Sequence, residues 1–173
     1  MKILIKEIFD TDFNPYYKTP NVNEFNIRRA SRGVLMKDNK IALLNVSKLN
    51  YHKLPGGGIE EGETLEEAFK REMAEEVGAE CEIVDQGGIV IEWRGKWKLM
   101  QLNYVFMANV VGEIKGNKLT QEESDNQFEL EWFDAHKVLE ILGDDKSNDY
   151  ESKFIKIRDV SIIDFYGDKI FIK

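Results

Sequence analysis

Residues 57–79 read GGIEEGETLEEAFKREMAEEVGA, and this stretch carries the clearest structural signals of the chain. Thr64 is followed three residues later by Glu67, a capping box in which each side chain satisfies a backbone amide of the first helical turn. Gly78 stands where a helix commonly ends in a left-handed residue. We therefore expect one helix from Thr64 to about Val77.

This helix carries acidic residues where an amphipathic helix should be apolar. Between residues 60 and 76 there are eight glutamates and two cations. At about 100° per residue, one apolar stripe that should face the core is formed by Leu65, Ala68, Phe69, Met73 and Val77. Glu76 falls in the middle of this stripe, Glu72 lies beside it and Glu75 lies at its edge. A solvated face, the usual explanation of a charge run, would place these acids on the opposite side.

Three neighbouring carboxylates that point inward repel one another and are costly to bury. A hard divalent cation removes both problems, because Mg²⁺ or Mn²⁺ takes carboxylate oxygens, keeps some waters and also binds phosphate oxygens. The pattern therefore predicts a metal site on the inner face of the helix.

The loop before the helix, LPGGG at residues 54–58, predicts close approach of the backbone to a ligand. Gly56, Gly57 and Gly58 are candidate substrate-binding residues, since a glycine loop that leads to a helix N-terminus offers amides to an anion. The sequence is neither a P-loop nor a GxGxxG fingerprint. Followed by the inward-facing acids, it indicates a site for phosphate and metal together.

The whole stretch resembles the Nudix box, Gly-x5-Glu-x7-Arg-Glu-U-x-Glu-Glu-x-Gly-U, where U is a bulky aliphatic residue. Its polar and glycine positions are filled by Gly57, Glu63, Arg71, Glu72, Glu75, Glu76 and Gly78. Ala79 departs from the pattern, being smaller than the usual last U. The flanking LPGG at 54–57 and Trp132–Phe133 extend the likeness to roughly residues 30–142.

The resemblance implies an α/β fold, an α/β/α sandwich around a mixed β-sheet. It also implies Mg²⁺- or Mn²⁺-dependent hydrolysis of a nucleoside diphosphate linked to another group X. By matched position Glu72, Glu75 and Glu76 would hold the metal. Arg71 would brace the loop through Glu63. Arg71, Glu63 and a general base then form the candidate catalytic set.

We expect water to attack phosphorus, because metal ions screen the diphosphate charge and lower the pKa of a bound water. The products would be a nucleoside monophosphate and X-phosphate, or diphosphate where the substrate is a nucleoside triphosphate. Glu75 is one candidate general base. Glu122 and Glu123, in an acidic loop expected at residues 121–126, are others. Four aromatic residues could stack a nucleobase: Tyr51, Trp93, Trp97 and Tyr104.

Two other functions fit the same scaffold. One is a nucleotide- or ADP-ribose-sensing domain that no longer cleaves, for which a degraded box is expected. The other is an isomerase of a prenyl diphosphate, which requires a catalytic cysteine; Cys81 follows the box without such a setting. The complete set of acids favours the hydrolase.

The whole chain, residues 1–173, reads as a single domain. Residues 1–29 form an N-terminal extension, with a strand at 3–9 and a loop at 10–23, and residues 143–173 form a C-terminal extension. Further strands are expected at 33–36, 41–44, 82–93, 97–111 and 128–133. Helices are expected at 135–142 and about 150–157, with a hairpin turning at 166–168. The extensions could complete the sheet or form a homodimer interface.

Composition limits the partners. The net charge of −8 lacks the basic surface that stable nucleic-acid or anionic-membrane binding needs. No uncharged apolar run approaches the roughly 20 residues that span a bilayer. One cysteine, Cys81, allows no internal disulfide and no multi-cysteine zinc site. The composition thus predicts a cytoplasmic protein, and the resemblance implies a small-molecule nucleotide as its substrate.

Overall fold

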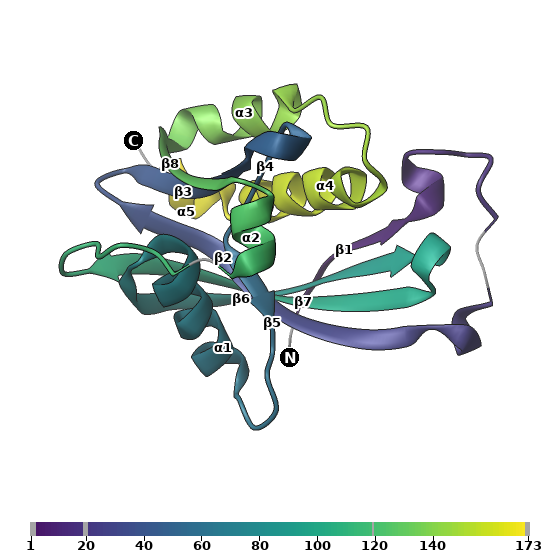
Figure 1. Cartoon of the computed structure of the whole chain (residues 1–173), viewed down its shortest axis with the longest axis horizontal. Coiled ribbons are helices and arrows are strands. Elements are labelled where there is room, and N and C mark those ends of the chain that lie inside the picture. The colour runs from purple at the N-terminus through teal and green to yellow at the C-terminus, as the bar shows by residue number, and fades with distance from the viewer. Residues whose placement is uncertain (1–2, 19–20, 119, 172–173) are drawn as a thin grey trace.

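Two long strands form the centre of the sheet in the computed structural model, which describes residues 3–18, 21–118 and 120–171. They are β6 (Glu80–Arg94) and β7 (Leu99–Val111), and they pair as an antiparallel hairpin. Each has a parallel neighbour, β1 (Ile3–Phe9) beside β6 and β2 (Asn26–Lys37) beside β7. The sheet is therefore mixed, as expected (Figure 1).

The second half of the sheet continues from β2 in antiparallel fashion. β3 (Lys40–Val46) pairs with β2, with β4 (Tyr51–Lys53) and with β8 (Phe128–Asp134). The three glycines of the loop form a short strand, β5 (Gly56–Gly58), that pairs with β2. The main strand order is β1-β6-β7-β2-β3-β4.

The helices are short apart from one at the C-terminal end. They are α1 (Leu65–Glu72), α2 (Gln121–Asp125), α3 (Val138–Asp144), α4 (Tyr150–Phe165) and α5 (Gly167–Ile170). Short 3₁₀ turns occupy Asp10–Asp12, Val22–Glu24, Ser47–Leu49, Gly95–Trp97 and Ala135–Lys137. No helix in the described ranges is both long and apolar enough to cross a membrane.

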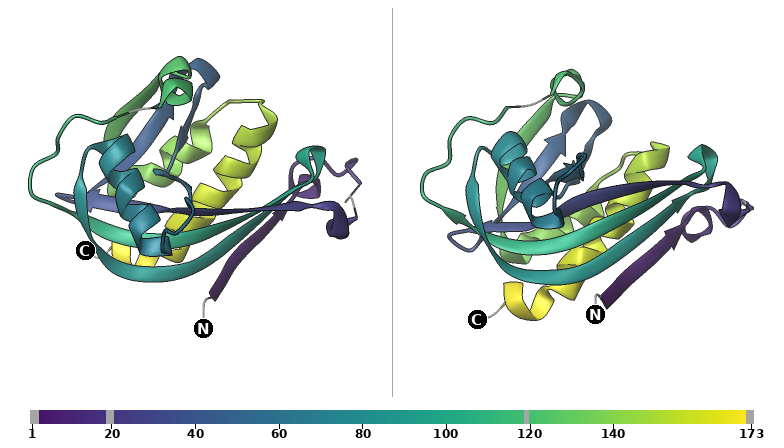
Figure 2. Two further views of the ribbon diagram at one scale, coloured as in Figure 1. Left: turned by 60° about the horizontal axis from the view of Figure 1, so that its bottom comes forward. Right: turned by 90° about the horizontal axis from the view of Figure 1, so that it is seen from below.

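Helices cover both faces of the sheet, because apolar residues of the central strands alternate in direction. Val34 and Val105 pack in a core with α3 and α4, whereas their neighbours Leu35 and Phe106 pack in a second core with α1. Figure 2 shows α1 and α4 on opposite sides of the strands. The predicted α/β/α sandwich is confirmed.

The helix that was expected at residues 64–77 is present, with a change of geometry near its end. Thr64 is the N-cap and accepts from the Glu67 amide, and the capping box is complete. Met73–Val77 form a wider π-helical turn, which ends at Gly78 with φ +72°. Single π turns often occur at functional sites, and this one carries two of the three candidate metal ligands.

The predicted C-terminal hairpin is wrong. The segment is helical, since α4 continues to Phe165 and α5 follows at once. Asp149 caps α4 by accepting from the amides of Glu151 and Ser152. Buried Phe154, Ile155, Ile162 and Ile163 then recur at helical spacing. The acidic segment expected as a loop at 121–126 also contains a helix, α2.

Both terminal extensions belong to the layers of the sandwich. β1 adds an edge strand next to β6, and α4 packs against β1, β4 and β6. Of the two roles considered for the extensions, the structure shows completion of the fold.

Candidate active site

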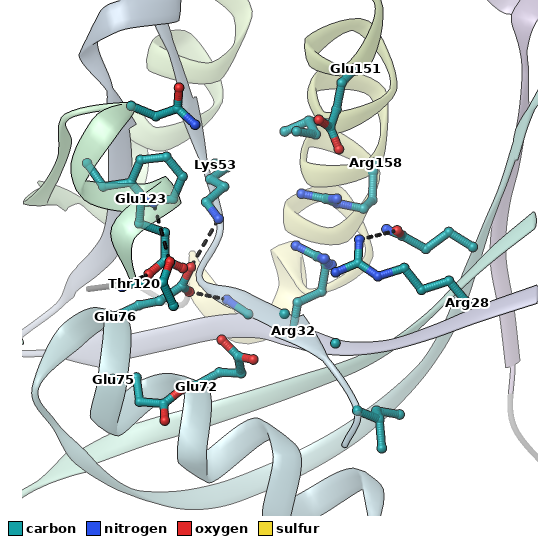
Figure 3. A pocket seen from close by; sticks show the side chains of 18 of the residues that line it. Arg28, Arg32, Lys53, Glu72, Glu75, Glu76, Thr120, Glu123, Glu151 and Arg158 are labelled. Atoms are coloured by element: carbon teal, nitrogen blue, oxygen red, sulfur yellow. Dashed lines mark hydrogen bonds and ion pairs between the residues drawn. The ribbon is translucent and has the colours of Figure 1, made fainter. Parts of the chain in front are cut away.

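A cleft of about 620 Å³ lies between α1 with its π turn, β5, α2 and α4. Figure 3 shows acidic side chains on one wall and arginines on the other. The candidate residues that line it are Gly56, Gly57, Gly58, Arg71, Glu72, Glu75, Glu76 and Glu123. Glu63 lies outside this lining and reaches it through Arg71. The structure thus brings the predicted set together around one cavity.

Two acids of α1 and its π turn, Glu72 and Glu76, point inward, as the helical wheel predicts. Glu76 is 1% exposed and Glu72 is 7% exposed, although both are ionisable. Glu75, expected at the edge of the apolar stripe, has a side chain that is 43% exposed. All three line the cleft. The sequence therefore located the acidic wall correctly.

Arg71 fastens this wall to the loop before it. Its Nε donates to Glu63 Oε1 at 2.7 Å and its Nη2 donates to Glu63 Oε2 at 3.1 Å. Its Nη1 donates to Glu72 Oε1 at 2.8 Å and to Glu75 Oε2 at 2.9 Å, while Nη2 also reaches the Gly58 carbonyl at 2.8 Å. The bracing of the loop by Arg71 and Glu63 is thus seen directly, as a fork of charge-assisted hydrogen bonds.

Glu76 has two partners of its own within the chain. Lys53 Nζ donates to Glu76 Oε1 at 3.0 Å, and the Gly56 amide donates to Oε2 at 2.6 Å. The buried carboxylate is therefore held in a fixed position beside β4 and β5. In this structure the Gly56 amide serves an acid of the protein itself, and the binding of substrate by Gly56, Gly57 and Gly58 stays a prediction.

The acids differ in the ease with which they ionise. Burial raises the pKa of Glu76, against the effect of Lys53 and the Gly56 amide. Burial, with a contribution from the charge of Glu76, also raises the pKa of Glu72. The hydrogen bond from Arg71 lowers the pKa of Glu63. The inner wall therefore favours a positive ligand that would compensate buried negative charge.

Gly57 is required for the close approach of β5 to the acids. A Cβ atom at residue 57 would lie 2.4 Å from Glu72 Oε1 and 2.7 Å from its Cδ. The glycine at this position thus leaves space for the Glu72 carboxylate, whatever its contacts with substrate.

Glu123 faces the acidic wall from α2 (Figure 3) and adds to the negative charge felt by Glu76. Its Oε2 accepts from the Thr120 amide at 2.7 Å, and its own amide donates to Thr120 Oγ1 at 3.3 Å. Glu123 therefore caps its short helix while it lines the cleft. The side chain of Glu122 lies outside the described residues.

The chemistry of the acidic wall suits a magnesium or manganese ion. The metal-binding atoms it offers are carboxylate oxygens, and two of the carboxyl groups, those of Glu72 and Glu76, are buried and have raised pKa values. Within the described ranges, no three acidic, histidine or cysteine side chains converge into a ready-made metal cage. Arg71 and Lys53 hold the acids in this structure. Metal binding would therefore require Glu72, Glu75 and Glu76 to exchange some of these hydrogen bonds.

The wall opposite the acids was missed by the sequence interpretation. It contains four arginines, Arg28 and Arg32 of β2, Arg94 at the end of β6 and Arg158 of α4. A signal was available for Arg158, which lies four residues from both Phe154 and Ile162 on the buried stripe of its helix. It is an ion on an apolar stripe, as Glu76 is.

Of the aromatic residues considered for nucleobase stacking, Tyr51 lines the cleft, and Phe128 lies there as well. Trp93 instead packs against Phe9 and Phe25 and lies outside the cleft lining.

Known proteins resemble this chain in sequence and in fold. Residues 27–154 match the NUDIX domain family. An ADP-ribose pyrophosphatase of Methanocaldococcus jannaschii is 33% identical over 117 residues, which cover 65% of this chain and 64% of that protein. An oxidized purine nucleoside triphosphate hydrolase of Danio rerio is 33% identical over 84 residues, which cover 48% and 49% of the two chains. The match thus spans less than two thirds of either relative.

Solved structures show the same fold. A NUDIX hydrolase from Nitrosomonas europaea superposes with a TM-score of 0.63 at 20% identity, over 83% of this chain and 90% of that one. The family match covers most of the chain, and five residues of its box line one cleft: Gly57, Arg71, Glu72, Glu75 and Glu76. The chain therefore belongs to the Nudix family.

Proposed function

We propose that the protein is a pyrophosphohydrolase that uses Mg²⁺ or Mn²⁺ to cleave the diphosphate linkage of a nucleoside diphosphate derivative. One observation carries the proposal: Glu72 and Glu76 are buried carboxylates that face a cleft. Named relatives that act on ADP-ribose or on oxidized purine nucleotides support the substrate class. The single cysteine favours a reducing, cytoplasmic setting.

Glu72, Glu75 and Glu76 would hold the ion. When bound, it would neutralise the diphosphate and make a bound water acidic enough to serve as a nucleophile at neutral pH. The products would be a nucleoside monophosphate and X-phosphate, or a nucleoside monophosphate and diphosphate from a nucleoside triphosphate.

The residues of the chain prepare this chemistry. Arg71 keeps Glu72 and Glu75 on one wall, and Lys53 with the Gly56 amide fixes Glu76. Glu75 and Glu123 are the two candidates for the general base. Glu75 is the more exposed of the box acids, whereas Glu123 is engaged in capping α2. Both are already engaged in this structure, Glu123 by its cap and Glu75 by Arg71 at 2.9 Å, so that either must release a hydrogen bond before it acts as the base.

The test is an activity panel with the full chain and Mg²⁺ or Mn²⁺: ADP-ribose, NADH, diadenosine polyphosphates, oxidised nucleoside triphosphates and sugar nucleotides. Glu76→Gln should lower kcat/KM by about 100-fold or more, since ligands to an ion matter at least as much as their supporting residues. Glu66→Gln is the matched control, on an exposed position of the same helix. Near-normal activity of Glu76→Gln would contradict the assignment.

The non-catalytic sensing domain is the alternative. It predicts that one of these nucleotides binds to the wild-type chain and is recovered intact after prolonged incubation with metal. Release of phosphorylated products that depends on Glu76 would exclude it.

A further inference from the structure

The arginine wall of the cleft holds more positive charge than its own partners neutralise. Arg94 pairs with Glu92 at 2.5 Å and with Glu151 at 2.5 Å. Arg158 pairs with Glu92 at 3.3 Å and with Asp159 at 2.6 Å. Three carboxylates thus serve these two arginines, and the remaining two arginines of the wall have a different kind of partner.

Arg28 and Arg32 are held by neutral amides. Arg28 Nη1 donates to Gln101 Oε1 at 3.1 Å, and Arg32 Nε donates to Asn103 Oδ1 at 2.8 Å. Within the described part of the chain, no carboxylate forms an ion pair with either guanidinium. Amides orient a guanidinium without cancelling its charge, and so this charge is available to a ligand.

The amides are themselves part of a buried network. Gln101 is 1% exposed and Asn103 is fully buried. Gln101 Nε2 donates to Asn103 Oδ1 at 2.9 Å, and Asn103 Nδ2 donates to Glu92 Oε1 at 3.1 Å. A satisfied buried network of this kind fixes the orientation of its members. The two guanidinium groups are therefore held in a fixed orientation, Arg32 in a buried position and Arg28 in an exposed one.

Arg32 is the strongest sign of a ligand. It is 4% exposed, and its terminal nitrogens face the cleft beside Arg28 and Arg158 (Figure 3). Burial, together with the charge of Arg158, lowers the pKa of Arg32 to about 10, and it therefore remains charged at neutral pH. The charges of Asp159, Glu92 and Glu76 act in the opposite direction, but none of these acids forms an ion pair with Arg32. A buried cation with no direct ion pair is unfavourable, and an anion bound in the cleft would relieve it.

The two walls meet at β5. A Cβ at Gly56 would lie 2.4 Å from Arg32 Cβ, and the amide of the same Gly56 holds Glu76. A diphosphate on the acidic wall would therefore continue directly towards Arg32. Arg28 and Arg158 line the same cleft. Arg158 also lies beyond residues 27–154, the part that matches the family.

We propose that Arg28 and Arg32, beside the carboxylate-paired Arg158, form a subsite for a phosphoryl group outside the scissile diphosphate, so that the protein prefers substrates with such an additional phosphoryl group over those whose group X is a neutral sugar. The proposal rests on the proposed hydrolase function. The additional group has two possible sources: a longer linear polyphosphate chain, or a phosphate branching from the nucleoside or from X.

The subsite can be tested without catalysis. Calorimetry with inorganic tripolyphosphate and EDTA-treated full-length chain should show binding by the arginine wall alone. Arg28→Gln and Arg32→Gln should each weaken it by about 10-fold or more, as expected for a charge-assisted hydrogen bond. Arg28 is exposed, and so Arg28→Gln should fold. Arg32 is buried, and Arg32→Lys, which keeps the charge, is used as a second variant at this position in case Arg32→Gln does not fold.

Arg29→Gln is the matched control. It removes the same charge from the same strand, but Arg29 lies over the Tyr104 ring at 5.5 Å and outside the cleft lining. Equal weakening by Arg29→Gln, or unchanged binding in Arg28→Gln, would overturn the subsite and indicate a diffuse charge effect.

Two substrate pairs then identify the source of the phosphoryl group. Diadenosine tetraphosphate against diadenosine diphosphate tests the longer chain, and NADPH against NADH tests the branching phosphate. In the pair that contains the recognised phosphoryl group, the substrate with the additional phosphoryl group should have a kcat/KM about 10-fold higher than its partner, and Arg28→Gln should remove this difference. Metal-dependent hydrolysis with no preference in either pair would overturn the subsite and leave the hydrolase function intact. Tripolyphosphate binding as expected, with no hydrolysis, would overturn only the function.

Discussion

Replacing Gly57 with alanine adds one methyl group beside the Glu72 carboxylate and leaves every side chain of the acidic wall chemically unchanged. The added Cβ would lie 2.4 Å from Glu72 Oε1, whereas ordinary contacts begin at 3.4 Å. The carboxylate must therefore withdraw by about 1 Å. Since Glu72 is also held by Arg71 at 2.8 Å, this movement disturbs the arginine fork as well.

A misplacement of about 1 Å in a catalytic group can cost about 100-fold in rate, or roughly 3 kcal/mol of transition-state stabilisation. We therefore expect Gly57→Ala to lower kcat/KM by about 100-fold. Gly57 does not have positive φ, so backbone strain is absent from the comparison. The fold should persist, because the flexible end of Glu72 can move.

The assay is steady-state hydrolysis of the best substrate of the panel, with circular dichroism and a thermal melt as checks of folding. Gly143→Ala is the control, because its added Cβ has no heavy atom within 4 Å and it lies outside the cleft. Wild-type kcat/KM in folded Gly57→Ala would refute the claim that Glu72 is held in a functional position by this close approach.

Three further perturbations test other parts of the site and fold. Arg71→Lys retains the charge but offers three donors in place of the five hydrogen bonds that Arg71 makes. In urea unfolding the free energy of unfolding should fall by about 2 kcal/mol, and kcat/KM should fall by about 10- to 100-fold. Unchanged stability would show that the hydrogen bonds of Arg71 do not hold the wall together. Burial raises the pKa of Glu72 and Glu76 above the ordinary value of 4.5. The metal-free protein should therefore lose stability as pH rises from 4.5 through the raised pKa values, where the folded state must give up protons that the unfolded state has already lost. Mg²⁺ should raise Tm more at pH 8 than at pH 5, and an increase in Tm that is the same at both pH values would count against Glu72 and Glu76 as ligands. Burial opposes protonation of His52, but the hydrogen bond and charge of Asp145 raise its pKa above 6.5. The stabilisation provided by the His52–Asp145 ion pair should therefore be present below pH 6.5 and lost as pH rises through the raised pKa. In thermal melts, Asp145→Asn should lower Tm more at pH 5.5 than at pH 9.

Helical periodicity was sufficient to place the acidic wall. The orientation of Glu72 and Glu76 follows from local geometry, because Thr64 and Gly78 fix where the helix begins and ends. The partner of Glu76 does not follow from it, since Lys53 lies on β4 and reaches Glu76 only when the sheet is assembled. Local patterns thus predict which way a side chain points, but not what it meets.

The C-terminal segment shows the limit of periodicity more clearly. Its β-branched residues, such as Val160, Ile162 and Ile163, favour a strand when taken alone. In the structure α4 packs on the sheet through β1, β4 and β6 and on α3, and so apolar residues surround much of the helix and blur its amphipathic pattern. The error hid Arg158, and with it part of the basic wall.

The basic wall could not be assembled from sequence because it joins residues far apart in the chain. Arg32 and Asn103 are 71 residues apart, and Arg158 and Glu92 are 66 apart. They meet only because β2 lies beside β7 and α4 packs against β6. Tertiary contacts of this kind decide which arginines keep a free charge.

The central claim is that Glu72 and Glu76 face inward to bind a divalent cation. Calorimetric titration of the metal-free chain with Mn²⁺, performed on the wild type, Glu76→Gln and the exposed control Glu66→Gln, tests it most directly. Binding by the wild type and the control, with affinity reduced by about 10-fold or more in Glu76→Gln, is the predicted result. Absence of Mn²⁺ uptake by the wild type, or equal uptake by all three, would contradict the account.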